Sequence, residues 1–266
     1  MSKLFFIGAG KMASAIAGGI VKAGIFSANE ISAFDVNPQA AEAFTALTGV
    51  RCVSDAESEL AAAENVLIAV KPQYLKAALS AYKGKFSGKL VISIVAGVTI
   101  DTLSEMTGTA RIVRVMPNTP VLAGKGAAAF AGASEASERD LALVSNIFNA
   151  AGIGLEVPEK LLDAVTGLSG SGPAYVFEFI QALADGGVAE GLPRDKALLL
   201  AAQTVLGAAA MVLESGRHPA VLKDEVTSPG GTTARGLEKL AEKGFSGTVL
   251  QAVRAASARS AELGKK

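Results

Sequence analysis

The sequence contains a single cysteine, a single histidine and no tryptophan among its 266 residues. Cys52 cannot form a disulfide within the chain, and no histidine stands near it to activate the thiol, so we interpret it as inert in a reducing, cytoplasmic protein. His218 directly precedes Pro219, and we expect it to cap a helix or lie on the surface rather than act as a general acid. No group of His, Cys, Asp and Glu has metal-ligand spacing, so we predict no metal site.

An excess of charge of one sign is also missing. The 25 basic residues are balanced by 25 acidic ones, which argues against a nucleic-acid-binding surface. The first apolar run, Leu4–Ile7, is shorter than the roughly 7–15 residues of a secretory signal core. The longest uncharged stretch, Ala197–Leu213, is nearly long enough to cross a membrane. Polar and small residues interrupt it, which favours a buried or interfacial helix over a membrane span.

Residues 1–157 alternate short apolar runs with amphipathic stretches. The runs are Leu4–Ile7, Glu30–Phe34, Asn65–Val70, Leu90–Val95 and Arg111–Val115. Continuous apolar runs of this length suit strands that are buried on both faces. The stretches between them, such as Lys11–Ala23 and Pro38–Leu47, are typical of helices. This alternation predicts an α/β domain of the Rossmann type, with a doubly wound parallel sheet, over residues 1–157.

Residues 158–266 have a different hydrophobic rhythm, which predicts helices alone. The expected helices are Glu159–Thr166, Gly172–Glu190, Arg194–Ser215, Pro219–Val226, Thr233–Lys243 and Gly247–Leu263. Ala174–Leu183 and Ala197–Leu213 are apolar on nearly every side, and a helix without a polar face must be buried on several sides. A thin bundle of this length cannot bury them alone. We therefore expect an all-helical C-terminal domain that dimerises with a second copy of the chain.

The segment Gly8–Ala13 fits the pattern Gly-x-Gly-x-x-Ala. It follows a predicted strand and opens a predicted helix, which is the context that a dinucleotide-binding fingerprint requires. Gly8 permits the tight turn, Gly10 lets a pyrophosphate approach the backbone, and Ala13 lets the helix pack on the strand. The helix N-terminus then offers free N–H groups and a partial positive charge to the phosphates. The predicted cofactor contacts in this segment are Gly8, Ala9, Gly10, Lys11 and Met12.

Asp35 lies 22 residues after Ala13, where the second predicted strand ends. An acid at this place usually accepts hydrogen bonds from the adenosine ribose, which favours NADH because a carboxylate would repel the 2′-phosphate of NADPH. The alternative is an exposed residue in the turn Asp35-Val36-Asn37-Pro38. The sequence does not decide between the two interpretations. Asn37 is a further candidate cofactor contact in the same turn.

Three more corners follow predicted strands: Ala69-Val70-Lys71-Pro72, Ala96-Gly97 and Met116–Pro120. In an open parallel sheet the ligand crevice lies outside the carboxyl ends of the strands. We therefore expect the first two corners, Lys71 included, to contact the cofactor, and Asn118 and Thr119 to hydrogen-bond the substrate. Ordinary turn chemistry is the alternative for each of them.

The helical half carries two further glycine-rich segments, Thr166–Ala174 and Thr227–Thr233. Both are predicted to break the chain between helices and to lead into a helix. Such a break exposes several backbone N–H groups and hydroxyls together, which suits a carboxylate without a basic side chain. A pair of helix caps is the alternative, although it explains less of the second segment.

Over nearly its whole length the sequence resembles the Δ1-pyrroline-5-carboxylate reductases, the last enzymes of proline biosynthesis. The resemblance rests on five segments: Ile7–Gly10, Ala69–Gln73, Arg114–Pro120, Leu168–Tyr175 and Val226–Thr233. It implies a Rossmann domain, an all-helical dimerisation domain, and dimers that often assemble into decamers. It also implies hydride transfer from NADPH or NADH to C5 of a cyclic imine, giving L-proline.

The resemblance further implies roles for individual residues. Ala69, Lys71 and Pro72 would line the nicotinamide side. The last segment would hold the substrate, with the hydroxyl of Thr233, the implied catalytic residue, on the ring nitrogen. The implied substrate contacts there are Ser228, Gly230, Gly231, Thr232 and Thr233. Many relatives carry a neutral residue in place of Asp35 and use NADPH, so Asp35 departs from the family pattern.

Two other functions are less consistent with the sequence. A β-hydroxyacid dehydrogenase needs a catalytic lysine on the helix after its glycine-rich segment, and the helix after Gly172 begins Pro-Ala-Tyr-Val-Phe-Glu-Phe. A non-catalytic dinucleotide sensor would not need the full Ser228–Thr233 segment. The sequence therefore favours the reductase over both.

Overall fold

The computed structural model describes residues 3–264, which form two compact units. The sheet unit runs up to Ser171 and resumes at Ala255, and the helical unit is Gly172–Arg254. The hydrophobic rhythm changes earlier, at residues 157–158. The difference arises because the short helix α7 (Leu162–Val165) packs into the core beneath the sheet through Leu162. The end of the last helix is joined to α7 in turn, through a hydrogen bond from Ser260 to Asp163.

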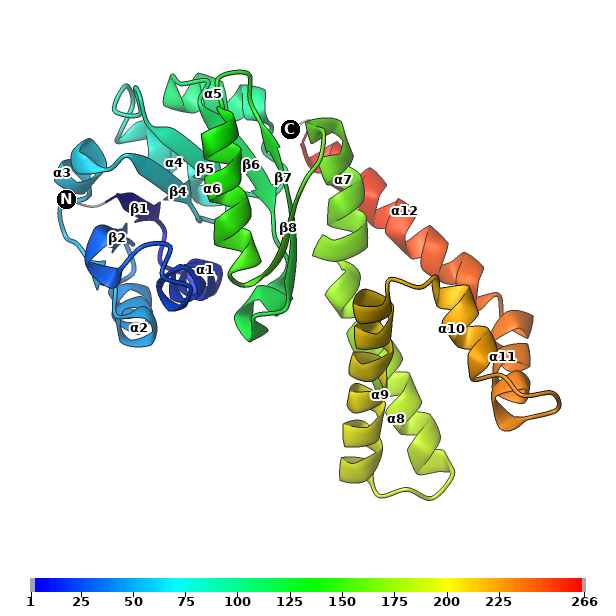
Figure 1. The fold of residues 1–266 in the computed structure, drawn as a ribbon. Coiled ribbons are helices and arrows are strands. Elements are labelled where there is room, and N and C mark those ends of the chain that lie inside the picture. Colours follow the sequence, from blue (N-terminus) through cyan, green and yellow to red (C-terminus); the bar gives the residue numbers. More distant parts are fainter. Residues whose placement is uncertain (1–2, 265–266) are drawn as a thin grey trace. The chain divides into compact units, whose positions relative to one another are not determined.

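The sheet unit is built on an eight-stranded sheet with the order β3-β2-β1-β4-β5-β6-β7-β8 (Figure 1). The strands are β1 (Leu4–Ile7), β2 (Ile31–Phe34), β3 (Arg51–Cys52), β4 (Asn65–Ile68), β5 (Leu90–Ser93), β6 (Ile112–Met116), β7 (Gly126–Gly132) and β8 (Gly152–Glu156). The first six strands are parallel. Their order reverses between β1 and β4, and this switch point is where doubly wound sheets bind dinucleotides.

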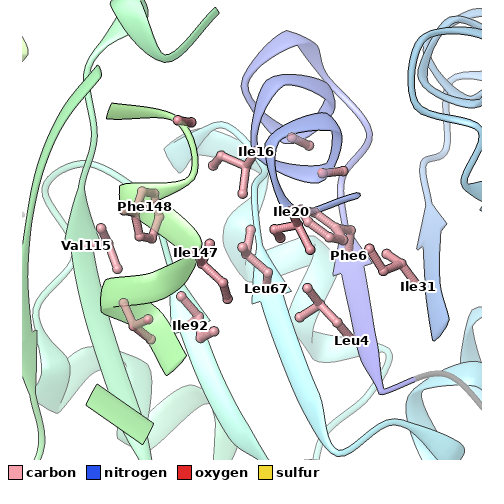
Figure 2. Close-up of a cluster of buried hydrophobic side chains, with 14 of the residues drawn as sticks. Leu4, Phe6, Ile16, Ile20, Ile31, Leu67, Ile92, Val115, Ile147 and Phe148 are labelled. Carbon is pink, nitrogen blue, oxygen red and sulfur yellow. The ribbon is translucent and has the colours of Figure 1, made fainter. Parts of the chain in front are cut away.

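Helices cover both faces of the sheet. They are α1 (Lys11–Lys22), α2 (Pro38–Thr48), α3 (Ala56–Ala62), α4 (Pro72–Ser80), α5 (Ile100–Thr107), α6 (Glu138–Asn149) and α7, with 3₁₀ turns at Ala28–Glu30, Thr119–Ala123 and Glu159–Leu161. Side chains alternate along each strand, so β1 sends Leu4 and Phe6 to one face and Phe5 and Ile7 to the other. Figure 2 shows the cluster of buried side chains that contains Leu4 and Phe6, where α1 and α6 pack on the strands.

The five strands predicted from apolar runs are all present, and the sheet is the expected Rossmann type. The sheet is mostly parallel, with one antiparallel pair that the apolar runs do not predict. β7 runs antiparallel to β6, and β8 then pairs parallel to β7. Both were missed, together with the two-residue β3, because they are short or rich in glycine and alanine rather than in β-branched residues.

The helical unit contains α8 (Gly172–Ala189), α9 (Arg194–Ser215), α10 (Pro219–Glu225), α11 (Thr232–Glu242) and the first part of α12 (Phe245–Leu263). These bounds agree closely with the predicted helices. α8 and α9 pack against each other through small residues, Ala184, Ala197 and Ala201. Small side chains allow close approach but bury little area, so most of the large apolar side chains of this unit lie at its surface.

One helix of the described residues, α9, is long and apolar enough to span a membrane. Only 11% of its apolar 18-residue stretch is buried within the chain. Leu199 and Leu213 are 70% and 76% exposed in the single chain. The expected burial of this stretch is therefore not achieved by the chain's own fold.

Candidate dinucleotide and substrate site

The turn from β1 into α1 has the geometry that the glycine pattern predicts. Gly8 has φ +102°, and a Cβ added there would lie 2.8 Å from the Ala69 carbonyl oxygen, so backbone approach excludes any side chain. Gly10 is the N-cap of α1, and no side chain caps the helix there. A Cβ added at Gly10 would meet nothing within 4 Å. The space beside this backbone is open, which fits a pyrophosphate.

The start of α1 supplies donors toward that space. The first intrahelical bond recorded runs from Ser14 N to Gly10 O at 2.9 Å, so the N–H groups of Lys11, Met12 and Ala13 have no acceptor in the helix. The first turn carries no acidic side chain that would compete for them. A helix end of this kind attracts a phosphate through its free donors and its dipole.

Asp35 has a definite structural role. Its Oδ2 accepts a hydrogen bond of 2.7 Å from Ala9 N, and its Oδ1 accepts one of 2.9 Å from Asn37 N. The carboxylate therefore ties the glycine loop to the end of β2, in addition to forming the predicted turn. Asn37 is the N-cap of α2, and its Oδ1 accepts from Gln39 N at 3.0 Å. Each Asp35 oxygen keeps a further lone pair, so contact with a ribose stays a prediction.

The next two predicted corners lie at the same edge of the sheet. Ala69 N donates to Ile7 O at 2.8 Å and Ile94 N to Ile68 O at 3.1 Å, which continues the ladders just past the strands. Lys71 is the N-cap residue of α4, with Pro72 at its first position and no side-chain cap. The Lys71 side chain is exposed. Gly97 follows β5 with φ +73°. The structure thus brings the predicted cofactor residues of three strands to one edge.

Asn118, a predicted substrate contact, lies at the end of β6 and is 8% exposed. Its Oδ1 accepts a hydrogen bond of 2.8 Å from Ala127 N in β7. The side chain therefore joins the Met116–Pro120 corner to the neighbouring strand, and only its Nδ2 group remains for a substrate. The signal for this role is absent from the sequence, because Ala127 becomes a partner only when β7 pairs with β6.

The first glycine-rich segment of the helical half does not break the chain, so that prediction was wrong. Residues Thr166–Gly170 form a π-helical turn that follows α7 directly, with Ser171 N donating to Thr166 O at 2.8 Å. The hydroxyls of Thr166 and Ser169 donate back to carbonyls one turn earlier. A Cβ added at Gly170 would lie 2.6 Å from Met116 Cε, so the glycine leaves room for that side chain. The hydroxyls are consequently not gathered around a free backbone.

The second segment, between α10 and α11, has the predicted open turn. Gly231 N donates to Ser228 O at 3.0 Å, and Gly230 has φ +68°. Gly231 is the N-cap of α11 and no side chain caps that helix. A Cβ at Gly231 would lie 2.3 Å from Ser228 Oγ, so glycine is required for the hydroxyl to sit beside the helix start. Free N–H groups of Thr232 and Thr233 adjoin the same place.

The comparisons with known proteins agree with this geometry. Residues 159–263 match the model described as pyrroline-5-carboxylate reductase dimerisation, and residues 3–97 match the one described as NADP oxidoreductase, coenzyme F420-dependent. The pyrroline-5-carboxylate reductase of Arabidopsis thaliana is 49% identical over 98% of this chain and 95% of its own length. The chain belongs to the pyrroline-5-carboxylate reductase family.

Solved structures of this family share the fold throughout. The Coxiella burnetii pyrroline-5-carboxylate reductase has a TM-score of 0.92 and 35% identity, covering 100% of this chain and 99% of that one. The Plasmodium falciparum enzyme, solved with NADP bound, has a TM-score of 0.88 and 38% identity over 99% and 98% of the two chains. The α/β sheet followed by helices is therefore the pyrroline-5-carboxylate reductase fold.

The structure explains two further residues singled out in the sequence. His218 is the N-cap of α10, and its Nδ1 accepts from Ala220 N at 3.2 Å, as predicted. Burial raises the pKa of the Cys52 thiol, which keeps it protonated and unreactive. No group of three metal-ligating side chains occurs among the described residues.

Proposed function

We propose that the protein reduces Δ1-pyrroline-5-carboxylate to L-proline with NADPH as the hydride donor. The observation that carries the proposal is a pair of uncapped helix starts in one chain of this family. One opens behind a Gly-x-Gly turn and suits a pyrophosphate, whereas the other opens behind Ser228 and suits a carboxylate.

The cofactor residues proposed are those at the edge where β1, β4 and β5 end. Gly8, Ala9 and Gly10 leave room for the pyrophosphate, and the N–H groups of Lys11 and Met12 donate to it. Asp35 and Asn37 lie at the adenosine end, and the corners after β4 and β5 lie at the nicotinamide end. When bound, NADPH supplies the hydride and the nicotinamide that holds it. NADP is bound in the Plasmodium falciparum relative, which supports NADPH over NADH.

The substrate residues proposed lie at the start of α11. The hydroxyl of Ser228 and the N–H groups of Thr232 and Thr233 receive the carboxylate of the imine. Thr233 Oγ1 makes no hydrogen bond recorded within residues 3–264, so it is free to bond the ring nitrogen. Gly230 and Gly231 hold the turn open, and the Nδ2 group of Asn118 is the further hydrogen-bond donor predicted for the substrate.

The chemistry asks little of the protein beyond these contacts. A cyclic imine takes a proton from water and becomes an electrophilic iminium at C5. The chain then orients the imine, with Thr233 on its nitrogen, and holds it close to the hydride donor. The lack of a paired acid and base in the sequence is consistent with this division of labour.

The match of residues 159–263 to a dimerisation model indicates a homo-oligomer. We expect dimers through the apolar faces of α8 and α9, which can assemble further into decamers. The balanced charge of the chain supports neither a nucleic-acid partner nor a membrane one. The cytoplasm remains the expected compartment, since the chain has one unpaired cysteine and uses a reduced nicotinamide.

The decisive test is the loss of absorbance at the reduced-nicotinamide band, measured with Δ1-pyrroline-5-carboxylate and either NADPH or NADH. Rapid loss with L-proline as product is expected, and it should be faster with NADPH. Binding of NADPH without oxidation would refute the reductase and support the dinucleotide sensor instead. Oxidation of NADPH with a 2-keto or 3-oxo acid but not with the imine would point to a different dehydrogenase.

A further inference from the structure

The end of α12 lies against the corner that follows β5. A Cβ added at Gly97 would lie 3.8 Å from Leu263 Cβ and 3.9 Å from the Leu263 carbonyl carbon. The backbone at Gly97 therefore lies beside Leu263, with room for about one methyl group between them. Gly97 belongs to the Ala96–Gly97 corner, which the proposed function places at the nicotinamide end of the cofactor. The last residues of the described chain therefore meet a cofactor loop that is distant in sequence.

A buried hydrogen bond holds this end of α12 in place. Ser260 is 7% exposed, and its hydroxyl donates to Asp163 Oδ1 at 2.7 Å. Asp163 lies on α7, whose neighbouring Leu162 is 1% exposed in the core under the sheet. α7 is thus held in place by the core, and the hydrogen bond of Ser260 joins the end of α12 to it. Because both partners lie within the sheet unit, this tie is part of one compact body.

The far side of the same corner is held by Glu159. Its Oε1 accepts a hydrogen bond of 2.8 Å from Ile100 N, at the start of α5, and another of 2.9 Å from Arg114 Nη1. The loop between β5 and α5 is therefore fixed at its end by Glu159, and Val95 and Val98 anchor it in the core on either side of its tip. Gly97, in the left-handed region, has no Cβ of its own to pack. The tip at Gly97 is thus the part of the loop whose neighbour is the end of α12.

We propose that the last two turns of α12 act as a brace that positions the Ala96–Gly97 loop for the nicotinamide half of the cofactor. Ser260 and Leu263 are positioning residues in this brace, since they act through Gly97. The role rests on the proposed function only for the identity of the cofactor. It predicts that loosening the brace weakens cofactor binding while the substrate site at Ser228–Thr233 stays intact.

The test is a fluorescence titration of NADPH against the full chain, carrying Ser260→Ala, Asp163→Ala, both together, or Leu263→Gly. Loss of one hydrogen bond should weaken NADPH binding about 3- to 10-fold. The double variant should be no weaker than either single one, because the two side chains share one bond. Leu263→Gly removes the Cβ that faces Gly97. Leu263 is 49% exposed and is the last residue of α12, so this variant should keep the fold and still weaken binding.

Two controls separate positioning from general stability. Ser257→Ala removes a hydroxyl on the same helix, for which no hydrogen bond is recorded, and should leave NADPH binding unchanged. Ser260→Thr keeps the hydroxyl and should restore it. In the imine assay, KM for NADPH should rise with Ser260→Ala, whereas kcat at saturating NADPH and KM for the imine should stay near the wild-type values.

Unchanged NADPH affinity in both Ser260→Ala and Leu263→Gly, with only a lower melting temperature, would overturn the brace. The titration needs no turnover. A wild-type chain that binds NADPH but does not reduce the imine would therefore refute the proposed function and still leave the brace open to test.

Discussion

The sheet unit and the helical unit are both rich in apolar residues, but they bury them differently. In the sheet unit, Leu4, Phe5, Phe6 and Ile7 are each at most 2% exposed, because helices cover both faces of the sheet. In the described helical unit the buried apolar residues are three alanines and Leu222, whereas Leu199 is 70% exposed. The same apolar character is thus satisfied within the chain in one unit and requires a second chain in the other.

The largest effect on stability is expected from a comparison of two phenylalanines, one buried and one exposed. Phe6 is fully buried and packs on Phe44 with ring centres 5.9 Å apart, whereas Phe177 on α8 is 64% exposed. Phe6→Ala should lower the free energy of unfolding by about 4 kcal/mol at any protein concentration. Phe177→Ala should change it only through association, so its effect should vary with protein concentration in denaturant melts. Equal losses of unfolding free energy in the two variants, independent of protein concentration, would contradict this comparison.

The next effect concerns the dimer itself. Leu199→Glu introduces a carboxylate on the exposed face of α9, and burying it between two chains should cost about 3 kcal/mol, or roughly a 100-fold weaker dimer. Size-exclusion chromatography over a dilution series should show the monomer at concentrations where the wild type is associated. Leu47→Glu, at an equally exposed leucine of α2 in the sheet unit, is the matched control and should not dissociate the dimer.

Reduction of the imine and binding of the cofactor should also depend on residues of different units. Thr233→Ala in the helical unit should lower kcat/KM for the imine by about 1.5–3 kcal/mol in transition-state terms, since its hydroxyl bonds a charged nitrogen. NADPH affinity should be unchanged, because the cofactor residues lie on the other unit. Thr233→Ser should recover much of the rate. Wild-type kinetics in Thr233→Ala would remove this residue from the mechanism.

Acid stability should follow the buried ion pair of the sheet unit. Arg111 donates to both oxygens of Asp140, at 2.9 and 2.7 Å, and its guanidinium lowers the pKa of that carboxyl from 3.8 to about 2. A lowered pKa stabilises the fold above pH 4 and loses that contribution as the pH falls toward 2, a change of about 2 kcal/mol. Urea unfolding of Arg111→Met should show less destabilisation between pH 5 and pH 2.5 than the wild type.

The exposed pair of the helical unit supplies the contrast. Arg217 lowers the pKa of Glu225 through a hydrogen bond, but both side chains are solvated, and surface pairs of this kind contribute little. Glu225→Gln should leave the pH dependence of unfolding unchanged. A shift as large as that of Arg111→Met would show that exposure does not separate the two pairs.

The smallest effect on catalysis is expected at Asp35. Replacing it with Ser removes the repulsion of a 2′-phosphate and should raise the NADPH/NADH ratio of kcat/KM about 5-fold, or about 1 kcal/mol. Asp35→Asn removes the charge but keeps an oxygen for Ala9 N, so it should shift the ratio without the general loss of affinity that Ser brings. An unchanged ratio in both variants would mean that Asp35 serves only the glycine loop.

Much of the fold could be predicted because apolar runs report directly on burial. β1, β2, β4, β5 and β6 lie between two helical layers, and their sequences are apolar for that reason. β8 (Gly152–Glu156) could not be predicted in the same way, since it lies at the edge of the sheet. Its side chains are partly exposed, and its pairing begins at Gly126 and Gly152, whose backbones approach too closely for any side chain.

The candidate site was predictable where backbone geometry requires a residue type. Gly8 and Gly231 are such cases, because a side chain at either would collide with the structure. Asn118 and Glu159 were not predictable in their roles, since their partners, Ala127 N and Ile100 N, come from other elements of the fold. Local sequence patterns thus indicate where the backbone is exposed, whereas the hydrogen bonds that hold the loops form only in the tertiary structure.

The exposed face of α9 also has a consequence for the life of a newly made chain. Until it meets a second copy, the protein carries a helix apolar enough for a membrane, with most of that face in water. Dimerisation is second order in chain concentration, so its half-time lengthens as the concentration of newly made chains falls. Slow expression should therefore prolong the interval in which chaperones and proteases compete for the chain. The yield of native protein should rise faster than linearly with the rate of synthesis.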